Sequence, residues 1–296
     1  MKRMLMFAAL VIVAPVRADD DRGVKQTIVY VQKLQTSTGG FTSAVPPANA
    51  RLVVPTLRAT SAAVRALHYL DSAPLDKDAA VKFIESCWDE SSGGFSDMPQ
   101  GKNDVFTTAV ALLAVNTLKM PAEKYGPGAV KYMAENAKGF EEIRIAAAGL
   151  ESLNMKSPRA KAWLDDIDKM RNADGSFGKG AGQARATGSS VVTILRLGGK
   201  EADRDAVLKI LKTGQRANGG YGKEDSETAS DMETTYRVLR CFVMLKARPD
   251  NVEGLRSFIA KCRNEDGGYG TAPGQPSSVN GVYFAAIMRH WLNKND

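Results

Sequence analysis

The chain has 296 residues, of which 44% are hydrophobic and 25% charged, and its formal net charge is +7. This composition is typical of a globular protein and excludes disordered, collagen-like and coiled-coil chains. Three cysteines are too few for a disulfide scaffold, and two histidines leave little for metal binding or acid–base chemistry.

Residues 1–18 have the pattern of a secretory signal peptide. Lys2 and Arg3 precede an apolar run from Met4 to Pro15, and Val16 and Ala18 provide the small residues of a cleavage site. The run is too short to span a bilayer comfortably, although an uncleaved anchor or a buried N-terminal helix stays open as an alternative. We therefore expect a secreted or periplasmic protein, cleaved near Ala18, with no stable membrane insertion after cleavage.

Basic residues give no sign of a nucleic-acid partner. Loss of the signal would lower the formal charge from +7 to +4, because it removes three basic residues. The remaining basic residues alternate with acidic ones on the predicted helical faces. We therefore expect no nucleic-acid binding.

Six amphipathic helices are predicted along the rest of the chain, because apolar residues recur there at helical spacing. They cover residues 24–34, 78–88, 127–136, 158–170, 203–215 and 251–262. Pro127 and Pro158 fit the first turn of a helix, and the glycines that follow each helix fit left-handed C-terminal caps.

Each amphipathic helix is followed by a glycine–aromatic signature and then by a second helix rich in Ala, Val and Leu. The aromatic residues are Phe41, Phe95, Phe140, Phe177, Tyr221 and Tyr269. The second helices are predicted over residues 60–70, 105–118, 143–153, 188–197, 232–245 and 281–292. The third unit is degenerate, since Phe140 runs directly into its second helix without a connector.

A unit of this kind cannot bury its apolar face alone, so neighbouring units must stack. Six helical hairpins can close into a ring, with the apolar helices inside and the amphipathic helices outside. An open solenoid is the alternative, but it has no evident use for a glycine–aromatic connector of nearly constant length. The sequence therefore predicts an all-α fold, an α6/α6 toroid of six hairpins in two concentric layers.

The repeats resemble those of the prenyltransferase and squalene-cyclase family. The runs Asn218-Gly219-Gly220-Tyr221-Gly222 and Asp266-Gly267-Gly268-Tyr269-Gly270 are close to the family form. The resemblance covers residues 24–292 and includes the β subunits of protein prenyltransferases such as Rab geranylgeranyl transferase. It implies one toroid domain over residues 19–296, with a funnel-shaped central cavity that accepts an isoprenoid in the enzymes.

The family's zinc ligands are not retained. The prenyltransferases hold zinc through an Asp-x-Cys pair and a His, whereas the matching positions here are Thr187, Ser189 and Thr234. Neutral hydroxyls cannot replace thiolate and imidazole as zinc ligands. Cysteine and histidine elsewhere show no ligand spacing, so we expect no metal and no cofactor.

The acidic motif of the cyclases is also missing. The run from Asp165 to Asp168 lies on an outer amphipathic helix, where its carboxylates are expected to face water. Asp19, Asp20 and Asp21 fit the flank of a cleavage site, and the inner helices carry few aromatic residues to stabilise a carbocation. Squalene-type cyclisation is therefore not expected.

Other charged residues could serve a cleft at the starts of the inner helices. Candidates for catalysis are Asp104, Asp231, Glu233 and Arg185, although Asp104 and Asp231 also fit helix N-caps. The resemblance places a diphosphate-binding connector at Lys179 and Arg185, although charges on a connector are also commonly solvated. Neither interpretation of these residues is settled by the sequence.

We expect an exported prenyltransferase-like protein that lacks zinc-dependent catalysis. Its central cavity, lined by Ala, Val, Thr and Ile, would bind a lipid, an isoprenoid or a segment of a protein partner. One alternative is a geranylgeranyl-transferase-like or terpenoid-processing enzyme, and a second is a carbohydrate-active α/α toroid. Whether the protein is an enzyme is left open by the sequence.

Overall fold

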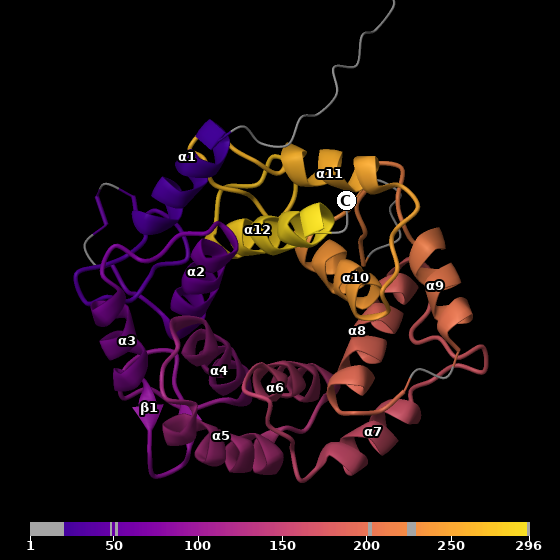
Figure 1. The fold of residues 1–296 in the computed structure, drawn as a ribbon, viewed down its shortest axis with the longest axis horizontal. Helices are drawn as coiled ribbons and strands as arrows, with labels where there is room; N and C mark the ends of the chain where they lie inside the picture. Colours follow the sequence, from indigo (N-terminus) through magenta and orange to yellow (C-terminus); the bar gives the residue numbers. More distant parts are fainter. Residues whose placement is uncertain (1–20, 48, 51–52, 201–202, 224–228, 295–296) are drawn as a thin grey trace, which may run out of the picture.

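The structure is a computed structural model that describes residues 21–47, 49–50, 53–200, 203–223 and 229–294. The predicted signal peptide lies outside these ranges. The described chain forms twelve α-helices in two concentric layers (Figure 1). The inner layer consists of α2 (Leu57–Tyr69), α4 (Val105–Leu118), α6 (Phe140–Ser152), α8 (Gln183–Arg196), α10 (Met232–Met244) and α12 (Val279–Lys294). The outer layer consists of α1 (Asp21–Gln32), α3 (Lys77–Ser86), α5 (Ala122–Asn136), α7 (Ala160–Asp168), α9 (Arg204–Thr213) and α11 (Val252–Lys261).

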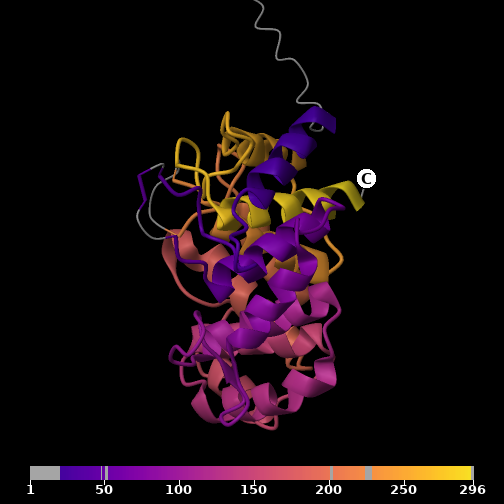
Figure 2. The same cartoon turned by 90° about the vertical axis from the view of Figure 1, so that its left-hand side faces the viewer.

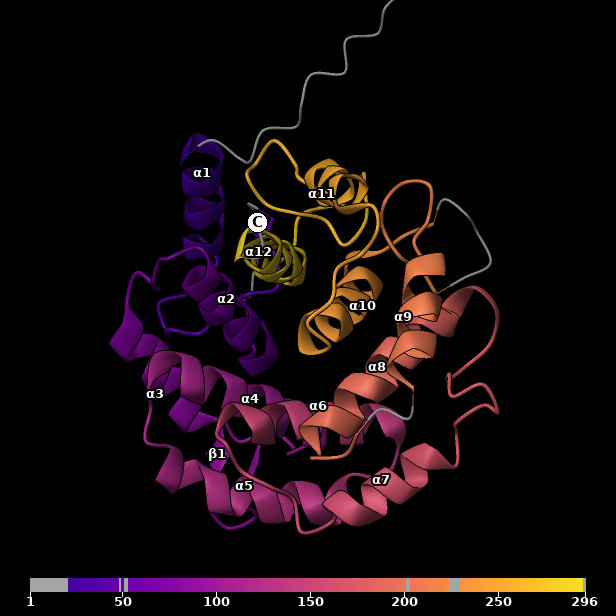
Figure 3. The same cartoon turned by 45° about the vertical axis from the view of Figure 1, so that its right-hand side comes forward.

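The inner helices close a complete ring. Each packs against the next, and α12 packs against α2, so the last hairpin meets the first. In Figure 3 the outer helices α3, α5, α7 and α9 lie outside this ring. The two-residue strands β1 (Trp88–Asp89) and β2 (Gly94–Phe95) pair antiparallel in one connector, and a short 3₁₀ turn, η1 (Gly180–Gly182), precedes α8. The predicted α6/α6 toroid is confirmed, and the open solenoid is excluded.

Within the described residues, no helix is long and apolar enough to cross a bilayer. The inner helices are instead apolar because they are covered by other helices. In α4, for example, Ala109, Ala111, Leu112, Ala114 and Val115 are all fully buried. A helix that is apolar on nearly every side belongs in a protein core when both faces are packed, as they are here.

Short polar side chains begin six of the helices. Each accepts a hydrogen bond from a backbone N–H in the first helical turn, which satisfies a donor that has no partner within the helix. These N-cap residues are Thr56, Asp76, Asp104, Asp203, Asp231 and Asn251.

A threonine on the inner helix holds the aromatic residue of the connector in four of the repeats. In each case the backbone N–H of the aromatic residue donates to the threonine Oγ1 at 2.9–3.0 Å. The pairs are Phe41–Thr60, Phe95–Thr108, Phe177–Thr187 and Tyr221–Thr235. The aromatic rings are buried, so this bond pairs a backbone donor that water cannot reach.

The glycines of the signatures do not cap helices, so that prediction is wrong. Gly39 and Gly219 lie in turns several residues after α1 and α9 end, with φ of +87° and +89°. A Cβ at Gly39 would lie 2.1 Å from the carbonyl oxygen of Ala79, and one at Gly219 would lie 1.9 Å from that of Gly254. Glycine is therefore required because the connector touches the backbone of the next outer helix.

The same contact closes the outer layer. A Cβ at Gly267 would lie 2.8 Å from the carbonyl oxygen of Gln26 on α1. Thr27 Oγ1 donates to the carbonyl of Gly267 at 2.8 Å, and Arg263 donates to the Gln26 side chain at 2.8 Å. The sixth connector thus docks on the first outer helix, and Figure 2 shows the indigo α1 beside the orange and yellow end of the chain.

Two helices, α5 and α8, begin five residues before their predicted starts, a larger shift than in the other helices. Helix α5 begins at Ala122 rather than at Pro127, so Pro127 lies inside the helix, where it cannot donate a backbone hydrogen bond. Helix α8 begins at Gln183, five residues before the predicted start. The degenerate third unit is confirmed, because Phe140 is the first residue of α6 and follows its N-cap, Gly139.

Candidate functional site

Charged side chains of three inner helices meet near the N-terminal ends of these helices. Arg237 on α10 donates two hydrogen bonds to the Glu141 carboxylate on α6, at 2.8 and 2.9 Å, and also pairs with Glu233. Arg144 pairs with Glu141 at 2.9 Å, and Arg185 on α8 pairs with Glu233 at 3.3 Å. We call these five residues the ion cluster. Since α8 stands between α6 and α10 in the ring, the bond from Arg237 to Glu141 spans its inner face.

The ion cluster stays charged at neutral pH. Burial alone would raise the pKa of Glu141, but the hydrogen bond from Arg237 and the charge of Arg144 lower it to about 2. The pKa of Glu233 is lowered in the same way, because the charges of Arg237 and Arg185 outweigh its burial. Neither carboxyl is therefore a proton donor near neutral pH.

Further along the inner face, aromatic side chains from three helices pack together. The ring of Tyr236 on α10 stacks on that of Trp291 with a centroid distance of 5.6 Å, and it lies 5.2 Å from Phe284 and 5.9 Å from Tyr283. Tyr69 on α2 lies 6.5 Å from Tyr283. We call Tyr69, Tyr236, Tyr283, Phe284 and Trp291 the aromatic cluster. It joins α2, α10 and α12.

Three arginines surround the aromatic cluster. The guanidinium of Arg65 stands 4.1 Å over the ring of Tyr283 and donates to its hydroxyl, and that of Arg240 stands 5.3 Å from the ring centre of Trp291. Arg196 on α8 pairs with Glu151 at 2.8 Å, and Arg240 pairs with the same carboxylate at 3.4 Å. We call Arg65, Arg196 and Arg240 the arginine triad.

The inner face is more polar than the sequence suggests. Ile145, Ala148 and Val192 are only 8%, 5% and 4% exposed, whereas the partly exposed side chains there are mainly charged or aromatic. The small residues serve helix packing instead: a Cβ at Gly149 on α6 would lie 2.7 Å from the carbonyl oxygen of Ala109 on α4. The prediction of a cavity lined by Ala, Val, Thr and Ile is therefore wrong for the exposed part of the inner face.

The catalytic candidates from the sequence divide into two groups. Asp104 and Asp231 are N-caps that accept from Thr107 N and Thr234 N at 2.7 Å, and Asp104 also pairs with Arg58 at 2.8 Å. The N-cap interpretation of both is confirmed. Arg185 and Glu233 meet in the ion cluster, as given above.

The two basic residues that the resemblance places at a diphosphate-binding connector have different surroundings. Lys179 is exposed and directly precedes η1. Arg185 donates to Thr234 Oγ1 at 2.9 Å and to Glu233 at 3.3 Å, so its guanidinium is held within the ion cluster.

The residues at the expected zinc position do not fit a zinc ion. Thr187 Oγ1 is bound to the backbone of Phe177, and Thr234 Oγ1 accepts from Arg185 at 2.9 Å. Ser189 Oγ is buried and has no hydrogen-bond partner within the described ranges, and a neutral hydroxyl is a poor zinc ligand. Across the part of the chain that the structure describes, no three His, Cys, Asp or Glu side chains come together as metal ligands.

The remaining polar candidates lie away from the inner face. Asp165, Asp166 and Asp168 on α7 are exposed and pair with neighbouring Lys or Arg side chains, as the sequence predicts. The three cysteines are buried and form no disulfide bond, and burial raises the pKa of Cys87 and of Cys262 to about 12. These thiols are therefore unreactive at neutral pH.

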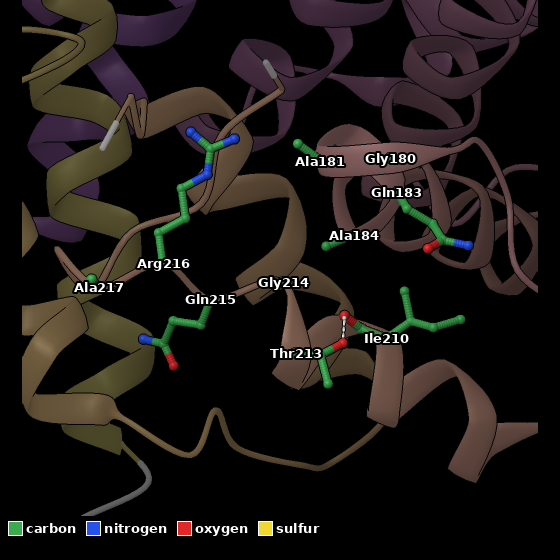
Figure 4. Close-up of a pocket in the computed structure, with 10 residues that line it drawn as sticks. All are labelled: Gly180, Ala181, Gln183, Ala184, Ile210, Thr213, Gly214, Gln215, Arg216 and Ala217. Carbon is green, nitrogen blue, oxygen red and sulfur yellow. Dashed lines mark hydrogen bonds between the residues drawn. The ribbon is translucent and has the colours of Figure 1, made fainter. Parts of the chain in front are cut away.

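A hollow of about 610 Å³ opens between the start of α8 and the end of α9 (Figure 4). The turn that precedes η1 does not press against the next outer helix, since a Cβ at Gly175 would meet nothing within 4 Å, unlike its equivalents at Gly39 and Gly219. Arg216 is the one charged residue among those that line it, which are Gly180, Ala181, Gln183, Ala184, Ile210, Thr213, Gly214, Gln215, Arg216 and Ala217. Such a lining offers little for catalysis.

The sequence analysis missed most of the inner-face residues. Glu141, Arg144, Arg237 and the arginine triad were not singled out, because each reads as an ordinary helix charge. Their spacing along the chain could have identified some of them. Within the buried helix α10, the charged residues Glu233, Arg237 and Arg240 recur at spacings of four and three residues, which places them on one side of the helix. Charges on one stripe of a buried helix must meet partners inside the protein.

Comparisons with known proteins agree with the architecture. The family described as "prenyltransferase alpha-alpha toroid domain" matches residues 4–142 and 143–295. The β subunit of protein farnesyltransferase from Arabidopsis thaliana is 23% identical over 141 residues, which are 45% of this chain and 29% of that protein. The chain thus spans less than a third of the length of that relative.

Solved structures of similar fold include two enzyme types. Protein geranylgeranyltransferase-I from Candida albicans, complexed with GGPP, has a TM-score of 0.61 and 12% identity, covering 80% of this chain and 84% of that one. The type II terpene cyclase MstE from Scytonema has a TM-score of 0.64 and 12% identity, covering 92% and 96%. At these identities the likeness concerns the fold alone. The family match extends over nearly the whole chain, which therefore belongs to the family of prenyltransferase alpha-alpha toroid domains.

Proposed function

We propose that the protein is an exported toroid that binds an isoprenoid-like lipid, or an apolar segment of a partner, at the inner face of its ring without zinc-dependent catalysis. One observation carries the proposal. The helical ring is complete, while Thr187, Ser189 and Thr234 stand where the family resemblance places zinc ligands, and two of these hydroxyls serve local hydrogen bonds.

The inner face supplies groups that suit such a ligand. Tyr236 and Phe284 are partly exposed and present ring surface on which an isoprenoid chain could pack. GGPP is bound to the Candida geranylgeranyltransferase-I structure, and a MstE structure holds geranylgeranyl dihydroxybenzoate. Both ligands carry an isoprenoid chain, which supports the same ligand class here.

Two measurements test the loss of zinc chemistry. Elemental analysis of the purified protein should find no stoichiometric zinc, and incubation with geranylgeranyl diphosphate, zinc and a thiol peptide should give no prenylated product. Lipid extraction followed by mass spectrometry should recover an isoprenoid or related lipid from the protein as purified. Tightly held zinc together with prenyl transfer would refute the proposal.

A terpenoid-processing enzyme that works without zinc is the second candidate, and the aromatic cluster favours it. Aromatic faces stabilise cations, so five rings in contact are a feature that a cyclase could use. Cyclisation also needs an acid, whereas Glu141, Glu151 and Glu233 are all paired with arginine. Conversion of geranylgeranyl diphosphate or its neutral analogues into a cyclic product, lost in Tyr236→Leu and retained in Tyr236→Phe, would favour this candidate.

Export and carbohydrate chemistry are tested separately. N-terminal sequencing of the exported form should begin at Asp19, and a cytoplasmic protein with Met1 intact would contradict export. Glycan cleavage that is lost in Asp231→Asn, with the fold retained, would favour a carbohydrate-active toroid. Because Asp231 is an N-cap and Asn caps helices equally well, we expect this variant to keep nearly the full stability and neither protein to cleave glycans.

A further inference from the structure

The arginine triad carries more positive charge than its surroundings balance. Its members come from α2, α8 and α10, and in the described part of the chain the one carboxylate paired with them is Glu151, which serves both Arg196 and Arg240. Arg65 contacts the hydroxyl and ring of Tyr283, and among the described residues it has no carboxylate partner. Three guanidinium groups beside one carboxylate leave an excess of positive charge on the inner face.

One donor of these guanidinium groups lacks an acceptor among the described residues. Tyr236 lies between the rings of Tyr283 and Trp291, over which Arg65 and Arg240 stand, so the two guanidiniums flank the same aromatic array. Arg240 Nε is buried and has no hydrogen-bond partner among the described residues. A buried charged donor without a partner is costly, which favours an anionic acceptor in the functional state.

We propose that Arg65, Arg196 and Arg240 form a binding site for a carboxylate or phosphate group, the head of an amphiphilic ligand whose apolar chain packs on the aromatic cluster. This inference rests on the proposed function, because it names the ligand class of the same inner face. Arg196 and Arg185 are 11 residues apart on α8, about 16 Å along the helix. The head group is thus bound far from the connector at Lys179 and Arg185.

The titration of Tyr236 is consistent with an unbalanced positive charge. Burial alone would raise its pKa, but the charges of Arg196, Arg65 and Arg240 lower it to about 8. An anion bound by the triad would cancel part of that field, so the pKa of Tyr236 should rise when the ligand binds. The charged and titratable groups that face Tyr236 are Arg65, Tyr69, Arg144, Arg196, Arg240 and Tyr283.

The test is calorimetric titration of the purified protein with three probes: farnesyl monophosphate, farnesol and inorganic phosphate. We expect farnesyl monophosphate to bind at least about tenfold more tightly than farnesol, because charge-assisted hydrogen bonds strengthen binding by about that factor. Equal affinity for the two lipids would overturn the anion site and leave the proposed function standing. No binding of either lipid would overturn the anion site together with the lipid-binding part of the proposed function, and binding of phosphate alone would overturn the lipid head-group site by showing a site for a free anion.

Variants locate the site. Arg65→Gln should weaken binding of farnesyl monophosphate about tenfold and leave farnesol unchanged, while Arg65→Lys should retain most of the affinity. Arg58→Gln is the matched control, since it removes the same charge from the same helix two turns earlier. In the unaltered protein, farnesyl monophosphate should shift the ultraviolet titration of Tyr236 to higher pH. An unchanged titration, or equal effects of Arg65→Gln and Arg58→Gln, would place the anion elsewhere and overturn the proposal.

Discussion

The backbone N–H of Phe95 donates to Oγ1 of Thr108 at 2.9 Å, and the same hydroxyl donates to the carbonyl of Asp104 at 2.8 Å. One side chain thus joins a buried connector to the first turn of an inner helix. The same bond between an aromatic N–H and a threonine hydroxyl recurs in three other repeats. In the sixth repeat the matching position, 13 residues after Tyr269, is Val282, which has no hydroxyl. The need for this hydroxyl explains why a threonine recurs near the start of these inner helices.

Replacing Thr108 with Val should destabilise the protein by about 1–3 kcal/mol, because the Phe95 N–H would stay buried without an acceptor. The free energy of unfolding in urea measures the effect. Thr117→Val is the matched control on the same helix, since the Thr117 hydroxyl only donates back to the carbonyl of Leu113. Equal losses for the two variants would show that the bond to Phe95 does not matter.

Gly219→Ala should be much more destabilising than Gly175→Ala. Both glycines have positive φ, +89° and +81°, so both variants lose about 1–2 kcal/mol from backbone strain. Only the alanine at position 219 would collide with the backbone of Gly254, which adds about 1–3 kcal/mol. Thermal and urea unfolding compare the two variants, and similar losses would disprove the role of the close contact.

Glu141→Gln should lower the free energy of unfolding at neutral pH by about 1 kcal/mol. Arg237 is only 8% exposed and loses one of its two charged partners, whereas the half-exposed Glu141 carboxylate is partly screened by water. The folded-state pKa of Glu141, about 2, lies below its ordinary value of 4.5. Its contribution to stability is therefore complete above pH 4.5 and is lost as the pH falls through 2.

The difference in unfolding free energy between the unaltered protein and Glu141→Gln should accordingly shrink over that acidic range. Glu135→Gln, on the exposed side of α5, is the control and should change stability little at any pH. A difference that does not depend on pH would contradict the assigned pKa of Glu141.

One tyrosine should ionise near pH 8 in the ligand-free protein, two units below the ordinary value for tyrosine. The ultraviolet absorbance of tyrosinate follows this step, and Tyr236→Phe should remove it. Because the folded-state pKa is lowered, the ionised form adds stability that is complete above pH 10 and is lost as the pH falls through 8. Titration of every tyrosine at pH 10 or higher would contradict the field of the arginine triad.

Local pattern was enough to predict the ring but not its inner face. The recurring glycine–aromatic signature and the alternation of helix types indicated which helices form the inner layer and which form the outer layer. Helix α4 was even predicted at its observed bounds. The role of the glycines could not be predicted, because Gly39 meets Ala79 and Gly267 meets Gln26 only after the ring forms. Such contacts depend on the tertiary structure and leave no local trace.

The polar contacts of the inner face could not be predicted from the sequence, because they also depend on the tertiary structure. Arg237 and Glu141 are 96 residues apart and belong to helices that are not neighbours in the ring. Asp104 and Asp231 were more conspicuous, yet their carboxylates serve as helix caps. Spacing along the chain reports the face on which a charge lies, but not the partner that it meets.

The central claim is that the inner face binds an isoprenoid-like lipid without zinc. Calorimetric titration of the chelator-treated protein with geranylgeraniol tests it most directly, with Phe284→Ala in the aromatic cluster and Phe106→Ala, exposed on α4 outside that cluster, as the control. We predict one molecule bound per chain, unchanged by added zinc and weakened only by Phe284→Ala. Failure of the chelator-treated protein to bind, with binding restored by zinc, would contradict the account.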